Sequence, residues 1–542
     1  MNKKIKSLIL ILMAVFVALA LTACGSDIKT LSKDPNKTAG KYAGMTVILH
    51  SNDVHGAIEG YSYMASLKAE IEKEGGNVIV VDNGDFTNGN IYVSLSKGES
   101  AVTLMNQVGY DIVALGNHEF DFGYENLKTN LEKASFNVIC SNVFKDGKPI
   151  FDSEIIYKIG KLKIGFFALL TPETQTKVNP ASIQGISFTE KEDLYKVAQE
   201  EVNKLKDKCD IIVCLSHLGV DDESMGNRSY DVYANVEGID FIIDGHSHTV
   251  MTEGKNAEPI QSTGTLFANI GVIVIDNNTK EIVSNELFDT ASLQLDSDVL
   301  ATAQNVIATV DSEFGAKFAE SEVRLEGEKT SVRSFETNLG DLICDALIWS
   351  VTNETTLEVD ADHVVAVTNG GGIRATIEAG DISRSTIKTV LPFGNTIAVN
   401  YVTGSELLEV LEASTYCTPE AIGGFPQIAG MKIKIDTTIP YDPGEEYPDS
   451  TYAAPKSIKR VTVLDVNGKT FDESATYAVV TNNFCAAGGD TYYAFKKAYD
   501  AGKGFDTSIL MDEALVNFIQ YELGGKIDST YAAPAGRIEI IK

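Results

Sequence analysis

Residues 116–121 bring together side chains that can bind a metal ion. An amide, an imidazole and two carboxylates lie in this stretch of six residues, directly after the apolar run 112–115. A short run rich in β-branched residues predicts a buried strand, which Gly116 ends. Because open α/β sheets place their ligands at the carboxyl ends of strands, these side chains are candidates for a site that binds a divalent metal. The alternative is a polar turn without function.

Four other segments repeat this pattern. Residues 45–50, 78–81, 211–215 and 241–243 also read as buried strands, and each is followed within three residues by aspartate, asparagine or histidine. The chain has seven histidines, and five of them lie in these strand-end segments: His55, His118, His217, His246 and His248. Helical patterns such as 63–74 separate most of the strands, which predicts stacked sheets with helices outside. The strand ends would then meet at one rim.

These motifs resemble a known family. Asp-x-His, Gly-Asp, Gly-Asn-His-Glu, His and Gly-His-x-His, in this order, resemble the calcineurin-like metallophosphoesterases. The resemblance implies two divalent ions, which could be Zn, Mn, Mg or Ca. One ion would be bound by Asp53, His55, Asp85 and His248. The other would be bound by Asp85, Asn117, His217 and His246, with Asp85 as the bridge.

The resemblance also implies a catalytic pair, His118 and Asp121. His118 follows a ligand directly, so it could reach the substrate without binding metal. There it could stabilise charge on phosphoryl oxygens or protonate the leaving alkoxide, while Asp121 orients the ring. A two-metal site clamps the attacking and leaving oxygens of a phosphoryl transfer. We expect Glu119 to be structural.

Glycine-rich loops mark the second half of the chain. A predicted strand at 364–367 leads into Asn369 and three glycines, which let backbone N–H groups approach an anion, and Arg374 adds a fork of donors. A tight turn without ligand is the alternative. Phe425 and Phe484 also lie in glycine-rich loops, where they could stack on a nucleobase. Alternatively, these rings anchor their loops to a core.

The order of these motifs is similar to a second family. Asn-Leu-Gly-Asp at 338–341, Asn-Gly-Gly-Gly-Ile-Arg at 369–374, Leu-Pro-Phe-Gly-Asn at 391–395 and Gly-Gly-Asp at 488–490 resemble the 5′-nucleotidase C-terminal domain. The chain thus resembles the secreted 5′-nucleotidases, which include UDP-sugar hydrolases. The resemblance implies that Arg333, Asn369 and Arg374 hold the phosphate and ribose. It further implies that Phe425 and Phe484 stack on the base and that Asp490 binds ribose.

A chain of 542 residues is too long for one core, so we expect two large domains. The predicted fold class is α/β: a four-layer α/β/β/α metallophosphoesterase sandwich followed by a second α/β domain, joined by a long helix. The predicted division is 1–23 signal peptide, 24–44 flexible tether, 45–290 metal domain, 291–325 linker with helix, and 326–542 substrate-binding domain. The apolar period of the helix within 296–318 also fits a core helix of the first domain.

The N-terminus has the pattern of a secretory signal. Basic residues within 2–6 precede an apolar run at 8–20, and Leu-Thr-Ala-Cys24 follows. These four residues resemble the lipobox of bacterial lipoproteins, so Cys24 is a candidate for lipidation. The alternative is an ordinary secretory signal. We expect the protein in the cell envelope, outside the cytoplasm, anchored to the lipid bilayer.

The charge limits the partners. With a formal net charge of −31, the chain is a poor ligand for nucleic-acid polymers, which bind through lysine and arginine. A small anionic substrate would need local cations. The expected function is extracellular 5′-nucleotidase activity on nucleoside 5′-phosphates. The alternatives are a 2′,3′-cyclic-nucleotide 2′-phosphodiesterase/3′-nucleotidase or a UDP-sugar hydrolase on the same scaffold, and, more distantly, a nucleoside-binding lipoprotein. The oligomeric state is left open.

Overall fold

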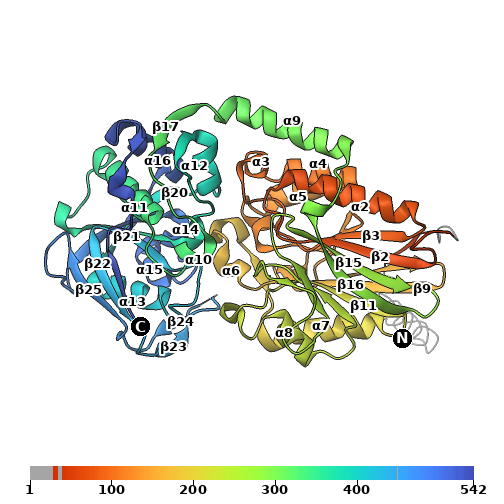
Figure 1. Cartoon of the computed structure of the whole chain (residues 1–542). Coiled ribbons are helices and arrows are strands. Elements are labelled where there is room, and N and C mark those ends of the chain that lie inside the picture. The colour runs from red at the N-terminus through yellow and green to blue at the C-terminus, as the bar shows by residue number, and fades with distance from the viewer. Residues whose placement is uncertain (1–28, 34–38, 449) are drawn as a thin grey trace, which may run out of the picture.

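Two α/β domains lie side by side in the computed structural model, which describes residues 29–33, 39–448 and 450–542 (Figure 1). The predicted signal peptide and Cys24 lie outside the described residues. No helix in the described part of the chain is long and apolar enough to cross a membrane.

The first domain is built on two sheets. The six-stranded sheet has the order β16 (Glu281–Asp289), β15 (Asn269–Asp276), β2 (Met45–Ser51), β3 (Asn77–Asp82), β4 (Ile112–Val113) and β5 (Asn137–Val138). The seven-stranded sheet has the order β1 (Thr30–Lys33), β8 (Glu154–Ile159), β9 (Leu162–Leu170), β11 (Ile211–His217), β12 (Phe241–Ile243), β14 (Ile260–Thr263) and β13 (Val250–Met251). Strands β2 to β5 run parallel, as do β9, β11, β12 and β14.

Alternating side chains build the layers. In β2, Ile48 packs between the two sheets, whereas Val47 and Leu49 face the helices on the outer side. Helices α2 (Tyr61–Lys73), α4 (Glu99–Val108) and α9 (Ser297–Phe314) cover the six-stranded sheet. Helices α7 (Lys191–Leu205) and α8 (Ser229–Asn235) cover the seven-stranded sheet. The predicted four-layer sandwich is therefore confirmed.

The second domain has a central five-stranded sheet with the order β21 (Pro426–Ala429), β18 (Val364–Asn369), β26 (Thr476–Asn482), β20 (Thr396–Thr403) and β27 (Gly504–Leu510). One face packs against α11 (Asn338–Glu354), α12 (Arg384–Val390) and α16 (Met511–Asn517). The other face packs against α13 (Gly404–Ser414), α15 (Tyr493–Asp500) and a small sheet of β25 (Val461–Val466), β22 (Met431–Asp436) and β29 (Ile538–Ile541).

Short elements lie where the domains meet. They are η2 (Asn117–Phe120), α6 (Thr174–Lys177), α10 (Lys329–Val332) and α14 (Asn483–Ala486). In Figure 1, α6 of the first domain lies beside α10 and α14 of the second.

Helix α9 connects the domains along one side (Figure 1). The Asp296 carboxylate caps it by accepting from the N–H groups of Asp298 and Val299. Val299 and Ala303 pack into the core of the first domain, so the helix serves that core as well as the connection.

The domain limits drawn from the sequence stay a prediction. Two strands lie in segments that were predicted to be linker and tether. β17 (Lys317–Ser321), inside the predicted linker, already pairs with β19 (Gly380–Ser383) and β28 (Lys526–Ile527) of the second domain. β1, inside the predicted tether, pairs with β8. Backbone pairing at a sheet edge needs no apolar pattern, and for that reason the sequence did not reveal β1.

Candidate metal centre and substrate pocket

The predicted metal ligands converge at one rim of the first domain. They lie at or just after the carboxyl ends of β2, β3, β4, β11 and β12. Asp85 joins two groups whose ligand atoms lie within 4.8 Å of one another: His55–Asp85–His118 and Asp85–His217–His246. Its Oδ2 is 3.2 Å from Nε2 of His217 and 3.7 Å from Nε2 of His55. This position fits the predicted bridge.

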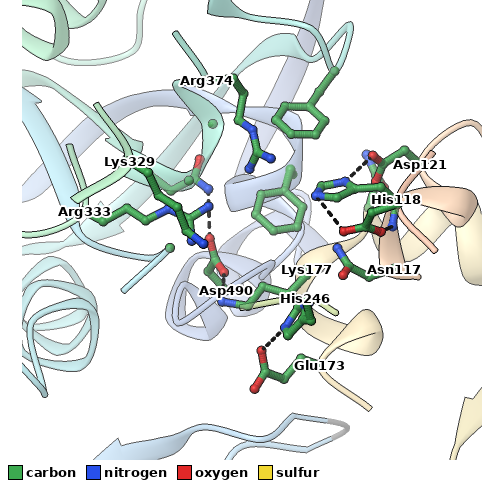
Figure 2. Close-up of a pocket in the computed structure, with 18 of the residues that line it drawn as sticks. Asn117, His118, Asp121, Glu173, Lys177, His246, Lys329, Arg333, Arg374 and Asp490 are labelled. Carbon is green, nitrogen blue, oxygen red and sulfur yellow. Dashed lines mark hydrogen bonds and ion pairs between the residues drawn. The ribbon is translucent and has the colours of Figure 1, made fainter. Parts of the chain in front are cut away.

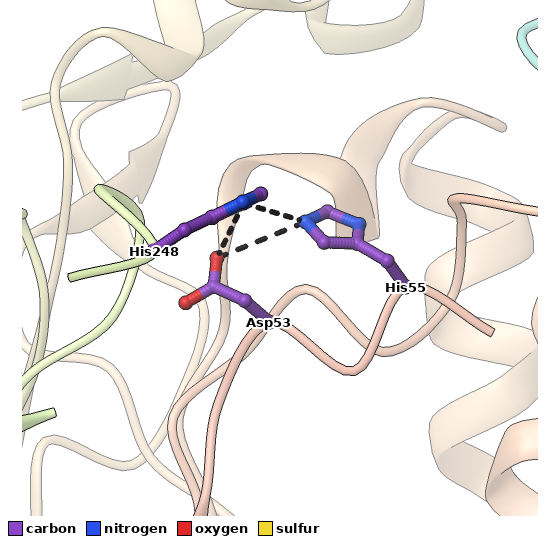
Figure 3. A group of neighbouring side chains, drawn as sticks. All are labelled: Asp53, His55 and His248. Atoms are coloured by element: carbon purple, nitrogen blue, oxygen red, sulfur yellow. Dashed lines mark hydrogen bonds and ion pairs between the residues drawn. The ribbon is translucent and has the colours of Figure 1, made fainter. Parts of the chain in front are cut away.

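A third group consists of Asp53, His55 and His248 (Figure 3). Nε2 of His248 is 3.4 Å from Oδ1 of Asp53 and 3.1 Å from Nε2 of His55. The structure therefore brings together the residues predicted for the first ion.

The donor set fits two divalent ions. Imidazole nitrogens, carboxylates and one amide oxygen are suitable ligands for such metals. The amide oxygen of Asn117 is buried and has no hydrogen-bond partner among the described residues, which leaves it available as a ligand. The backbone also holds unusual conformations here. Positive φ angles occur at five of the seven predicted ligands, Asp53, His55, Asp85, His246 and His248, and such strain is typical of functional sites.

The loops that present Asp85 and Asn117 are tied together by Glu119. Its buried carboxylate accepts hydrogen bonds from the backbone N–H groups of Gly116 at 2.6 Å and Asp85 at 2.8 Å, and also from Phe86 and Thr87. Burial, followed by the charge of Asp85, raises the pKa of Glu119 to about 7. A Cβ atom on Gly116 would lie 2.2 Å from Oδ1 of Asp85, so only glycine fits there. These contacts agree with the structural role expected for Glu119.

His118 lies beside the metal ligands with Asp121 behind it. Nδ1 of His118 is 2.6 Å from Oδ2 of Asp121, and Nε2 is 4.0 Å from Oδ2 of Asp85. Asp121 also accepts a hydrogen bond from Asn88 at 2.7 Å, which fixes the carboxylate. Burial lowers the pKa of His118, but Asp121 and Asp85 outweigh it and raise that pKa above its usual value. The ring is thus oriented with Nε2 toward the metal site.

One pocket joins this rim to the second domain (Figure 2). It holds about 950 Å³ of empty space, solvent at its mouth included. The first domain contributes Asp85, Asn117, His118, Asp121, His246 and His248. The second contributes Arg333, Asn369, Arg374, Phe393, Phe484 and Asp490. Five of the six residues predicted to bind substrate therefore line the pocket.

The two arginines are positioned for an anion. Within the described residues, neither Arg333 nor Arg374 forms an ion pair with a carboxylate. Burial, followed by the charge of Arg333, lowers the pKa of Arg374 to about 10. An arginine with that pKa still carries its charge at neutral pH, so both groups could bind a phosphate.

Asp490 is fixed by contacts from both domains. Its Oδ2 accepts a hydrogen bond from Asn369 at 2.8 Å, and its Oδ1 is 3.3 Å from Nζ of Lys177 in α6. The N–H of Asp490 donates to the backbone oxygen of Thr176 at 2.7 Å. These contacts link the predicted ribose site to the metal domain.

The position of Phe425 corrects the predicted stacking pair. Its side chain is 0% exposed and packs in the core with Ile422 and Val367, so it does not line the pocket. Phe393 lines the pocket instead. Its ring stacks on that of His118, with centroids 5.6 Å apart, and the guanidinium of Arg374 lies 5.6 Å from its centroid. The motif at 391–395 contained the signal for Phe393, but the sequence around a ring next to a glycine does not reveal which way the ring faces.

The sequence analysis did not single out several other pocket residues, among them Glu173, Lys177 and Lys329. Glu173 lies three residues beyond the end of β9, but no histidine or aspartate marks that strand end. Lys329 Nζ donates to the backbone oxygen of Ser247 at 3.4 Å, across the two domains. Burial, followed by the charges of Arg333 and Arg374, lowers the pKa of Lys329 to about 8. No motif marks the two lysines, because their position depends on how the domains meet.

Family models match both domains. Residues 46–250 match the model of the calcineurin-like phosphoesterases, and residues 307–497 match that of the 5′-nucleotidase C-terminal domain. The fold and the metal-binding groups thus define the first domain as a metallophosphoesterase. The chain as a whole belongs to the two-domain 5′-nucleotidase family, whose metallophosphoesterase domain uses two divalent metal ions.

Similar proteins agree with this assignment. The 5′-nucleotidase of Vibrio cholerae is 29% identical over 550 residues, which cover 91% of this chain and 92% of that protein. The trifunctional nucleotide phosphoesterase YfkN of Bacillus subtilis is 28% identical, and the chain spans only 32% of its length. The structure of a 5′-nucleotidase precursor from Thermus thermophilus is 28% identical, with a TM-score of 0.73, and the match covers 92% of this chain and 99% of that one. The chain is accordingly a metal-dependent phosphoric monoester hydrolase.

Proposed function

We propose that the protein hydrolyses nucleoside 5′-phosphates to nucleoside and phosphate outside the cytoplasm. The observation that carries this proposal is the pocket lined by metal-binding residues of one domain and by arginines and aromatic rings of the other. One nucleotide could therefore place its phosphate at the metal rim and its nucleoside against the second domain, because both surfaces line the same cavity.

In the proposed reaction, the first domain supplies the metal ligands and His118, and the second domain supplies the two arginines. The seven predicted ligands would hold two divalent ions, and such ions would supply positive charge and a water molecule of lowered pKa as the nucleophile. His118, oriented by Asp121, stabilises the charge on the phosphoryl oxygens or protonates the leaving alkoxide. Arg333 and Arg374 bind the phosphate through their N–H donors.

The second domain recognises the nucleoside. Asp490 accepts hydrogen bonds from ribose hydroxyls, with Asn369 holding its carboxylate. Phe393 and Phe484 stack on the base, each such contact contributing roughly 1–3 kcal/mol. Phe393 takes the place assigned to Phe425 from the sequence.

The test is phosphate release from a panel of substrates. Nucleoside 5′-phosphates, 3′-phosphates, 2′,3′-cyclic phosphates and a UDP-sugar are assayed with Mn²⁺, Zn²⁺, Mg²⁺ or Ca²⁺, and again with EDTA. We expect the highest kcat/KM on a 5′-phosphate and no release with EDTA. A higher kcat/KM on a cyclic nucleotide or a UDP-sugar would contradict the assignment.

Replacing both Phe393 and Phe484 by alanine should raise KM for nucleotides. Losing two stacking contacts of roughly 1–3 kcal/mol each corresponds to at least a tenfold effect. The kcat/KM for p-nitrophenyl phosphate should change little, since that substrate has no nucleobase. Equal losses on both substrates would exclude stacking. Phe425→Leu, which keeps an apolar side chain in the core, serves as the control and should leave both values near those of the native protein.

We also propose that the protein is anchored by lipid at Cys24. The support is the sequence alone: the apolar run at 8–20 continues directly into Leu-Thr-Ala-Cys. Cys24→Ser should release the protein from the membrane fraction and abolish labelling by a fatty acid. Continued labelling of this variant would contradict the anchor.

A further inference from the structure

Glu173 is a buried carboxylate in direct contact with a predicted metal ligand. It lies three residues beyond the end of β9, and its side chain is 2% exposed. Its Oε2 is 3.1 Å from Nε2 of His246 (Figure 2). None of the motifs that resemble the two families includes this residue, and the proposed chemistry does not use it.

Two other histidines of the centre show why this contact matters. His55 and His217 each have Nδ1 next to a backbone oxygen, that of Asn88 at 2.9 Å and that of Asn83 at 2.5 Å. Both therefore present Nε2 to the metal site. His246 is held in the opposite sense, because Glu173 occupies its Nε2 and leaves Nδ1 for the ion. It is also held by a charged carboxylate, whereas the other two are held by neutral carbonyls.

The loop that carries Glu173 is fixed independently of His246. The N–H of Thr171 donates to the backbone oxygen of His217 at 2.9 Å, and the N–H of Glu173 donates to the hydroxyl of Thr171 at 3.2 Å. The hydroxyl of Thr174 donates back to the oxygen of Thr171 at 2.7 Å. Since the loop is tied to a second ligand, His217, the carboxylate is in place before any ion binds.

We propose that Glu173 is a positioning residue that holds His246 with Nε2–H on the carboxylate and Nδ1 toward the ion shared with Asp85, Asn117 and His217. The carboxylate fixes the tautomer and the plane of the ring, so that Nδ1 carries the free lone pair. The inference rests on the two-metal centre of the proposed function, but it does not depend on the substrate. Removing such a partner typically lowers metal affinity roughly 10–100-fold.

The first test measures metal affinity without substrate. The full-length protein is stripped of metal and titrated with Mn²⁺, and the ions bound per chain are counted. The native protein should bind two ions. Glu173→Ala should bind one of them about 10–100-fold more weakly and leave the other almost unchanged. Glu173→Gln can still accept a hydrogen bond, so its affinity for that ion should lie between those of the native protein and Glu173→Ala.

Glu201→Gln is the matched control. Glu201 is another buried glutamate of the same domain, and it contacts Lys204 rather than a histidine of the centre. This variant should bind both ions as the native protein does. Native affinity for both ions in Glu173→Ala would overturn the proposal. So would an equal loss at both ions together with a lower Tm of the metal-free protein, which would mean that Glu173 only supports the fold.

The second test reads the tautomer directly. ¹⁵N NMR of the Zn²⁺-loaded protein with labelled histidine should show His246 protonated at Nε2 and bound to the ion through Nδ1. His246 bound through Nε2 would overturn the proposal, whatever the affinities. Because neither test uses a nucleotide, an absence of nucleotidase activity would contradict the proposed function and leave this inference standing.

Discussion

Replacing Asp85 by alanine should abolish phosphate release and reduce the metal content to fewer than two ions per chain. Asp85 joins two of the three groups of potential ligands, so its loss affects both ions. Metal ions contribute several kcal/mol to the stabilisation of charge in such reactions, and each 1.36 kcal/mol is tenfold in rate, so kcat/KM should fall by about 10³-fold or more. Phosphate assays and elemental analysis of the same sample check this.

Asp82→Asn is the matched control for that variant. Asp82 is also a fully buried aspartate, but it bonds to Ser51 and to the N–H of Gly84 rather than to the histidines. Burial raises its pKa well above the usual value and so favours the neutral carboxyl, for which asparagine is a close substitute. The control should retain two ions and most of the activity. Two tightly bound ions in Asp85→Ala would contradict the bridging role.

Replacing His118 by alanine should lower kcat by about 10²–10⁴-fold, the usual contribution of a general acid or base, and should leave two ions bound. Nδ1 of His118 is hydrogen-bonded to Asp121. His118 comes directly after the predicted ligand Asn117, but it is not itself a predicted ligand. Asp121→Asn should have a smaller effect, because the ring remains and only its orientation is weakened. Loss of an ion from His118→Ala would instead make His118 a ligand.

The metal centre was largely predictable from the sequence. The carboxyl ends of parallel strands meet at one edge of a sheet, so polar residues placed there must lie near one another once the strands are recognised. His217 shows this directly, since it is the last residue of β11 and touches Asp85. The placement of histidine also supported the prediction of a metal site, because most of the seven histidines occupy strand ends.

The substrate side was less predictable for a physical reason. Phe393 and Phe425 both lie in loops next to glycine, and only the packing of the second domain decides which ring is buried. Lys177 and Lys329 reach the pocket from separate domains, and no local pattern encodes how domains meet. Glu173 was overlooked because its strand end carries neither a histidine nor an aspartate.

The two-metal centre is tested most directly by a crystal structure of the protein with Mn²⁺, with data collected to show anomalous scattering from the metal. We expect two peaks at the rim of the first domain, with the carboxylate of Asp85 between them. Asp53, His55 and His248 should contact one peak, and Asn117, His217 and His246 the other. A single peak, or peaks that the Asp85 carboxylate does not touch, would contradict the two-metal centre on which the proposed hydrolysis depends.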